Sequence, residues 1–294
     1  MEERNTKIEK IHLLEAHEHP YDKYLRPGRI PHIFCPGCGL GSTMHVLIEA
    51  ILESGVDVNN VSVVSGIGCS GRISGYLNFD SFHTTHGRAI PFAIGLSVTD
   101  PERKVIVVTG DGDLAAIGGN HFIHAARRNA DITLICMNNF NYGMTGGQVG
   151  PTSFIGQIQT TAPYGNIESP FNLPGLAAAC GAIYVARWTA INVRRMKKSF
   201  IEAIRKRGFS FVEVVSECPT TFGRRNRLPD GKAIAEYFQK HAVLKHGADP
   251  QTVHIEKDGP IIIGKFVDIE DKDTLTDHLL AIQRIAMTST RRGL

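Results

Sequence analysis

Short apolar runs and longer amphipathic segments alternate along the chain. Runs rich in β-branched residues predict buried strands at 61–65, 104–109, 132–137, 182–186 and 209–215. Apolar residues at helical spacing predict helices at 40–53, 89–98, 118–129 and 191–207, and a shorter helix that ends at 180. This alternation predicts the α/β class, with a parallel sheet covered by helices on both faces.

Two segments flank the alternating region. Residues 1–34 are polar and contain Pro20, Pro27 and Pro31, which interrupt helices, so we expect an extended N-terminal arm. We assign 35–218 to the α/β domain. The pattern of 219–294 is less regular and predicts an extension that packs on the domain or on a partner.

Composition and charge exclude several classes of protein. Hydrophobic residues make up 42% of the 294 residues, which is enough for a sizeable core. The formal net charge of +3 does not favour nucleic-acid binding. No apolar run predicts a membrane span, and the charged N-terminus lacks a signal-peptide core, so we expect a cytoplasmic protein. There, cysteines favour metal binding or buried thiols over disulfides.

Polar residues and glycines follow two of the predicted strands directly. The strand at 104–109 runs into GDGD at 110–113, and the strand at 132–137 runs into the pair Asn138-Asn139. The carboxyl ends of parallel strands meet at one edge of a sheet, where ligands bind. Carboxylate and amide oxygens suit Mg²⁺, and glycines allow close approach to a phosphate. We therefore expect a site for a phosphate-bearing cofactor and a divalent cation.

Other interpretations of these turns are weaker. Gly, Asp and Asn also occur in ordinary turns, but two such turns at this spacing favour a site. An EF-hand is excluded because Ala116 stands where that loop requires glycine. The segment GIGCSG at 66–71 fits the dinucleotide-binding pattern, but the stretch after it is a poor helix.

Four cysteines form a second candidate site. Cys35 and Cys38 form a CxxC motif, Cys69 follows the first predicted strand, and Cys218 follows the last. Four thiolates suit a 4Fe–4S cluster or a structural zinc, and a CxxC alone is also typical of a redox pair. We expect the two remaining cysteines, 136 and 180, to be buried small hydrophobes.

These motifs together resemble a known family. In order along 27–225 stand FCPGCG, GIGCSGR, HTTHGRAIPFAIG, GDGD, MNNFNYGMTGGQ and CPT. They resemble the beta subunit of the 2-oxoacid:ferredoxin oxidoreductases. The segment GRRNR at 223–227 is similar to the 2-oxoglutarate branch.

The resemblance implies thiamine diphosphate, Mg²⁺ and one 4Fe–4S cluster. The implied magnesium ligands are Asp111, Asn139 and the carbonyl of Asn141. The implied cluster ligands are Cys35, Cys38, Cys69 and Cys218. Further implied cofactor contacts are Ile67, Gly68, Cys69, His86, Gly110, Gly112, Asp113, Gly143, Met144 and Thr145.

Two further residues have implied roles with plain alternatives. Arg72 is placed to meet a substrate carboxylate, although a solvated arginine is the simpler interpretation. His86 is placed to contact the diphosphate or to assist catalysis, although a hydrogen-bonded structural histidine is as reasonable.

The implied activity is coenzyme A-dependent oxidative decarboxylation of a 2-oxoacid, with electrons passed to ferredoxin, or the reverse carboxylation. The implied substrate is 2-oxoglutarate, giving succinyl-CoA, with a pyruvate-type member as the alternative. The chain has no room for a second domain carrying the activating Glu, so a separate alpha subunit and a hetero-tetramer are implied. The rivals are a thiamine enzyme without a cluster and a zinc-stabilised scaffold.

Overall fold

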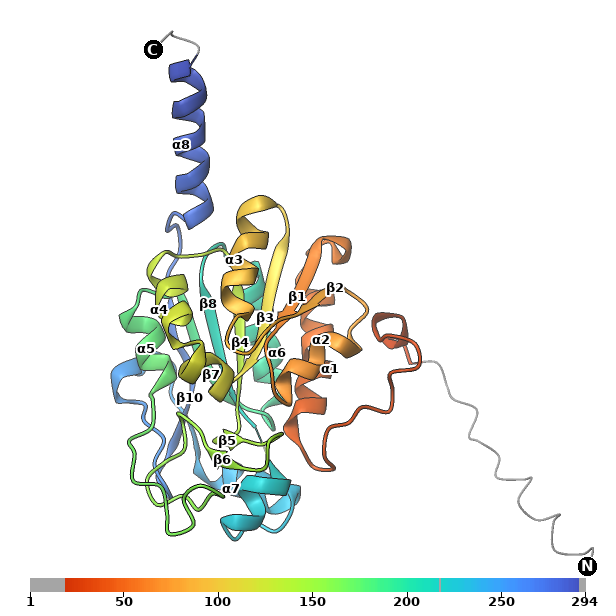
Figure 1. Cartoon of the computed structure of the whole chain (residues 1–294), viewed down its shortest axis with the longest axis vertical. Helices are drawn as coiled ribbons and strands as arrows, with labels where there is room; N and C mark the ends of the chain where they lie inside the picture. The colour runs from red at the N-terminus through yellow and green to blue at the C-terminus, as the bar shows by residue number, and fades with distance from the viewer. Residues whose placement is uncertain (1–18, 217, 291–294) are drawn as a thin grey trace, which may run out of the picture.

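The computed structural model describes residues 19–216 and 218–290. An eight-stranded sheet crosses it in the order β2-β1-β3-β4-β8-β7-β10-β9 (Figure 1). Neighbouring strands pair in parallel, except that β10 is antiparallel to β7. The predicted α/β class with its mostly parallel sheet is therefore confirmed. The strands of this sheet are β1 Val61–Ser65, β2 Asp80–His83, β3 Lys104–Gly110, β4 Thr133–Asn138, β7 Tyr184–Thr189, β8 Ser210–Val215, β9 Ala242–Leu244 and β10 Ile261–Asp268.

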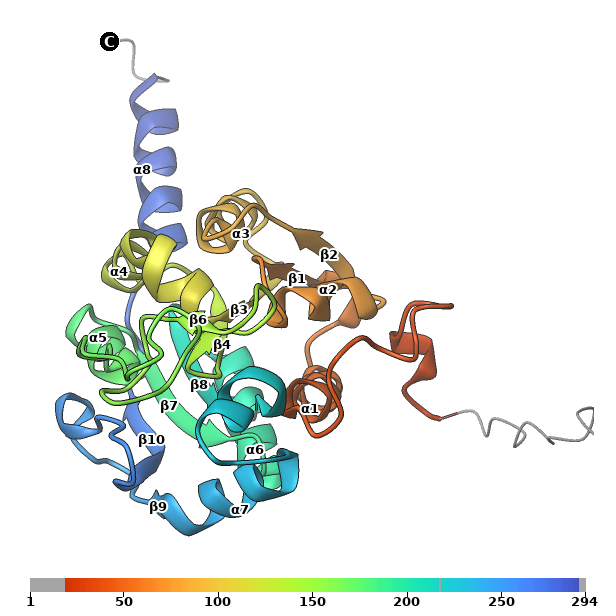
Figure 2. The same cartoon turned by 60° about the horizontal axis from the view of Figure 1, so that its bottom comes forward.

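Helices cover both faces of the sheet (Figure 2). The helices α1 and α6 pack together on one face, and α3, α4 and α5 lie on the other. Successive side chains of β4 point to opposite faces of the sheet. Ile135 packs in the core beneath α1 and α6, and Leu134 packs in the core beneath α3, α4 and α5, so both faces are apolar. The α-helices are α1 Gly39–Glu53, α2 Ile73–Tyr76, α3 Ala89–Thr99, α4 Gly119–Arg127, α5 Leu173–Ala179, α6 Val193–Arg205, α7 Gly231–His241 and α8 Leu275–Thr290.

The sequence pattern misses three strands of the eight-stranded sheet. The edge strand β2 is mostly exposed and polar, so it lacks the apolar run that marks a buried strand. The strands β9 and β10 lie in 219–294 and extend the sheet beyond β7. This segment is thus more regular than expected, since it also contains α7 and α8. The division of the chain at 34 and 218 stays a prediction.

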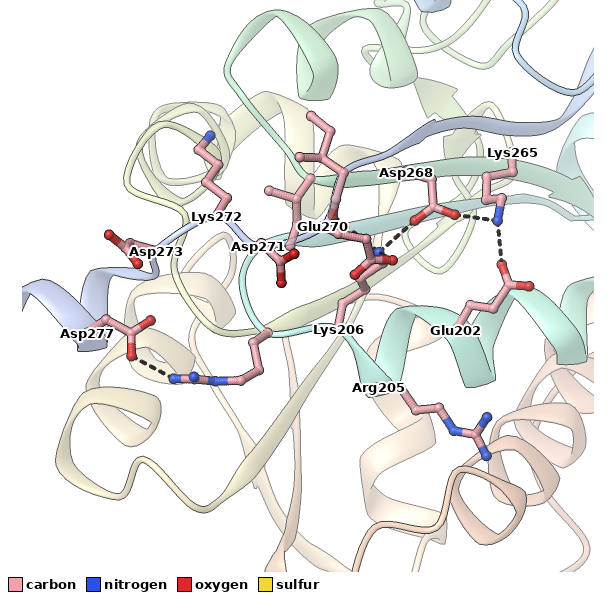
Figure 3. A pocket seen from close by; sticks show the side chains of 13 residues that line it. Glu202, Arg205, Lys206, Lys265, Asp268, Glu270, Asp271, Lys272, Asp273 and Asp277 are labelled. Atoms are coloured by element: carbon pink, nitrogen blue, oxygen red, sulfur yellow. Dashed lines mark hydrogen bonds and ion pairs between the residues drawn. The ribbon is translucent and has the colours of Figure 1, made fainter.

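The last helix, α8, extends away from the sheet (Figure 1). Its base is held beside a cavity of 730 Å³ lined mainly by charged side chains (Figure 3). The Arg207 guanidinium lies 2.7 Å from the Asp277 carboxylate, and Lys206 lies 2.7 Å from Asp268. Thr274 and Asp277 cap the first turn through reciprocal hydrogen bonds. Within 19–216 and 218–290, no helix is long and apolar enough to cross a membrane.

Candidate functional site

The GDGD turn follows β3 and buries a carboxylate. Asp111 is 2% exposed, and the Thr152 hydroxyl donates to its Oδ2 at 2.6 Å. Burial raises the pKa of Asp111 to about 7, although this hydrogen bond favours the ionised form. A bound cation would place a positive charge beside this carboxylate and so stabilise its ionised form. Gly112 is required beside it, because a Cβ there would lie 2.3 Å from the Tyr142 ring.

The second turn follows β4 and presents an unpaired oxygen. Among the residues that the structure describes, the buried Oδ1 of Asn139 has no hydrogen-bond partner. A buried amide oxygen without a donor is costly unless a ligand satisfies it. Phe140 adopts a left-handed conformation at φ 61°, so the turn departs from ordinary backbone geometry. Asn141 is buried and begins the short strand β5 Asn141–Tyr142, which pairs with β6 Gln148–Val149.

Both turns line one cavity of 110 Å³. It brings together all the residues expected to contact the diphosphate and its metal, from Ile67 to Thr145. Four further residues line this cavity that neither the sequence pattern nor the family resemblance predicted: Leu40, Ser70, Met137 and Tyr142. Leu40 and Met137 belong to regular elements, so only the fold places them here. Contact of these residues with a cofactor remains a prediction.

Asp113 links three loops around the cavity. Its Oδ1 accepts from His86 Nδ1 at 2.5 Å, from the Gly87 amide at 2.7 Å and from the Ile67 amide at 3.1 Å. Its Oδ2 accepts from the Thr109 hydroxyl at 2.7 Å. Because the carboxylate accepts, His86 carries a proton on Nδ1 and has Nε2 left for a ligand.

The four candidate cluster cysteines line a second cavity of 270 Å³. Burial raises the pKa of Cys38 to about 12 and that of Cys69 to about 11, and the neighbouring thiols of the set add to both shifts. In the described part of the chain, no three Cys, His, Asp or Glu side chains converge on a single ion. The other two cysteines differ, since Cys136 is buried as expected but Cys180 is only partly buried.

Arg72 lies apart from the cofactor cavity. It is exposed and lines a different cavity of 430 Å³, together with Arg26, Arg29 and His83. Among residues 19–216 and 218–290, no acidic residue lines this cavity beside Arg72. The structure therefore does not place Arg72 beside the two turns, and its contact with a substrate carboxylate stays a prediction.

Proteins of known families are similar to this chain. The family model of the thiamine pyrophosphate enzyme, C-terminal TPP binding domain, matches residues 66–214. The 2-oxoglutarate synthase subunit KorB of Methanothermobacter marburgensis is 50% identical over 258 residues, which are 87% of this chain and 89% of that protein. KorB of Methanocaldococcus jannaschii is 47% identical over 267 residues, 91% of this chain and 98% of that protein.

A solved structure is also similar. It is a 2-oxoglutarate:ferredoxin oxidoreductase from Magnetococcus marinus with 2-oxoglutarate, coenzyme A and succinyl-CoA bound. The TM-score is 0.81 at 30% sequence identity, and the match covers 92% of this chain and 91% of that one.

Fold and site together define a thiamine pyrophosphate-binding domain. The chain belongs to the beta subunits of the 2-oxoacid:ferredoxin oxidoreductases, a family of multi-subunit oxidoreductase enzymes.

Proposed function

We propose that this chain binds thiamine diphosphate and Mg²⁺ and carries a 4Fe–4S cluster. With an alpha subunit it converts 2-oxoglutarate and coenzyme A to succinyl-CoA and carbon dioxide, passing two electrons singly to ferredoxin and releasing one proton. The same enzyme runs the reverse carboxylation when reduced ferredoxin is supplied. The substrate assignment rests on relatives named for 2-oxoglutarate.

The observation that carries the proposal is the oxygen set of the two turns. The buried Asp111 carboxylate and the unpaired Asn139 oxygen line one cavity, and both are ligands of the kind that Mg²⁺ prefers. The Asn141 carbonyl is the proposed third ligand. The glycines at 110, 112 and 143 leave room for the phosphates, and His86 offers Nε2 to them.

The cysteine cavity fits a cluster better than a single ion. A structural zinc needs its sulfur ligands at about 2.3 Å from one point, and no such convergence occurs in the described part of the chain. Four thiols around a cavity of 270 Å³ instead leave room for several iron and sulfur atoms. The raised pKa of Cys38 and Cys69 also fits thiols that ionise only when metal binds.

The small cofactor cavity supports the need for a partner. Its volume of 110 Å³ is below the roughly 300 Å³ of small ligand sites, which supports a site for the diphosphate end of the cofactor alone. When bound, thiamine diphosphate would supply a nucleophilic carbon for chemistry at the keto group, and the cluster would supply a path for single electrons. The proposed alpha subunit would enclose the thiamine rings and provide the activating Glu.

Turnover by the anaerobically purified complex tests this proposal. The chain is co-expressed with its alpha subunit, and reduction of a low-potential dye is followed with a panel of 2-oxoacids and coenzyme A. We expect a brown complex that turns over 2-oxoglutarate fastest, and no turnover by the beta chain alone. A colourless complex with stoichiometric zinc would contradict the cluster, and faster turnover of pyruvate would contradict the substrate.

A further inference from the structure

A buried ion pair lies in the sheet behind the proposed metal site. Arg187 on β7 and Glu213 on β8 are register partners, and each side chain is 1% exposed. Arg187 Nε donates to Glu213 Oε2 at 2.5 Å, and Arg187 Nη1 donates to the Val253 carbonyl at 2.5 Å. Buried ion pairs contribute little net stability compared with apolar residues, so stability alone does not account for this one.

The carboxylate of this pair fixes the orientation of Asn138, the last residue of β4. Asn138 Nδ2 donates to Glu213 Oε1 at 2.7 Å. A carboxylate only accepts hydrogen bonds, so the amide nitrogen must face Glu213 and the amide oxygen must face the opposite way. Arg187 Nε donates to the other oxygen of this carboxylate, Oε2, so Glu213 is held in place with Oε1 left to accept from Asn138.

The oriented amide oxygen in turn holds the metal-binding turn. Asn138 Oδ1 accepts from the Phe140 amide at 3.1 Å and lies 2.9 Å from the Thr152 hydroxyl. The first contact supports the left-handed conformation of Phe140, which stands between the two proposed ligands 139 and 141. The second places Thr152, whose hydroxyl contacts Asp111 Oδ2 at 2.6 Å.

We propose that the Arg187–Glu213 pair is a positioning device for the divalent cation site and acts through Asn138. The inference rests on the proposed function, because it requires the cation at Asp111 and Asn139. Groups that orient metal ligands in this way typically change metal affinity by about 10–100-fold when they are removed.

Two matched double variants test the proposal. Both remove the buried charges, and both replace Glu213 with a side chain of similar size. In Arg187→Met/Glu213→Gln, the new amide oxygen can still accept from Asn138. In Arg187→Met/Glu213→Leu, the leucine side chain has no acceptor, so the Asn138 amide is free to turn. The measurement is binding of Mn²⁺, a substitute for Mg²⁺ at oxygen sites, to the αβ complex with thiamine diphosphate, followed by electron paramagnetic resonance.

We expect the Gln variant to bind Mn²⁺ as the natural protein does, and the Leu variant to bind it about 10–100-fold more weakly. Val185→Ala controls for general loosening, because Val185 is buried on β7 within the core beneath α4 and α5. It should lower the melting temperature without changing Mn²⁺ affinity. Equal affinity of the two double variants, or an equal loss in Val185→Ala, would overturn the inference. Failure of the natural complex to bind Mn²⁺ would instead refute the proposed function.

Discussion

Asp111→Asn should stabilise the cation-free complex at neutral pH while abolishing cation binding. Asp111 is fully buried, and its pKa of about 7 exceeds the ordinary value of 3.8 because desolvation penalises the ionised form. At 1.36 kcal/mol per pH unit, this difference corresponds to ~4 kcal/mol of unfavourable free energy in the native state. The neutral, isosteric amide carries no such penalty.

The sign of the pH dependence follows from proton linkage. Between pH ~4 and pH ~7 the native cation-free protein retains a proton on Asp111 that the unfolded chain has released. Stability therefore falls as pH rises through this window and is lower by the full ~4 kcal/mol above it. An Asp held by a salt bridge would behave in the opposite way, because its pKa is lowered on folding. Bound Mg²⁺ should cancel the penalty.

Thermal unfolding of the αβ complex in EDTA is the assay. Asp111→Asn should raise the melting temperature at pH 8 and change it little at pH 4, where Asp111 is protonated in the native state and about half protonated in the unfolded chain, so almost none of the penalty is present. Adding Mg²⁺ and thiamine diphosphate should raise the melting temperature of the natural complex only. A variant that melts at or below the natural complex at pH 8, or that still responds to Mg²⁺, would refute the assignment of Asp111 as a buried metal ligand.

Two further substitutions probe the two cavities separately. Cys38→Ser should strip the complex of most of its iron, whereas Cys180→Ser, outside the cluster cavity, should leave the iron content unchanged. A full iron content in Cys38→Ser would exclude Cys38 as a ligand. Gly112→Ala should weaken thiamine diphosphate binding about 10–100-fold, because overpacking against Tyr142 costs ~1–3 kcal/mol. Titration calorimetry measures this affinity. Gly119→Ala is the matched control, because a Cβ at Gly119 meets no atom of the described residues within 4 Å. Equal losses in both variants would contradict the steric argument.

The sequence predicts the centre of the sheet better than its edges. The apolar runs that become β1, β3, β4 and β8 are buried on both faces, so their composition alone marks them as strands. The edge strand β2 is mostly exposed, and its pairing with β1 decides its conformation. The strand β10 has an apolar run but sits after a long irregular stretch, and only its pairing with β7 shows where it belongs.

The site was predictable where polar residues end a buried strand. The two motifs follow β3 and β4, which are register partners, so their proximity follows from the parallel pairing. The supporting contacts were not predictable, because they depend on residues far apart in the chain. Thr152 reaches Asp111 across 41 positions, and Glu213 reaches Asn138 across 75. A single charged residue in an apolar strand, such as Glu213, was the available sequence signal of such a contact, since a charge rarely occupies a buried strand without a partner.

The cofactor cavity and the cysteine cavity share lining residues, which bears on how electrons would pass between the two proposed cofactors. Cys69, Asn139 and Met144 line both of them. Asn139 is a proposed magnesium ligand and Cys69 a proposed cluster ligand, so the two proposed cofactor sites are adjacent. Electrons leaving the proposed thiamine site would have a short path to the proposed cluster. Asp113 connects the two sites, because its carboxylate accepts from the Ile67 amide in the cysteine loop and it lies in the same GDGD turn as Asp111. A change at Asp113 should therefore disturb both cavities at once, unlike a change at either ligand set alone.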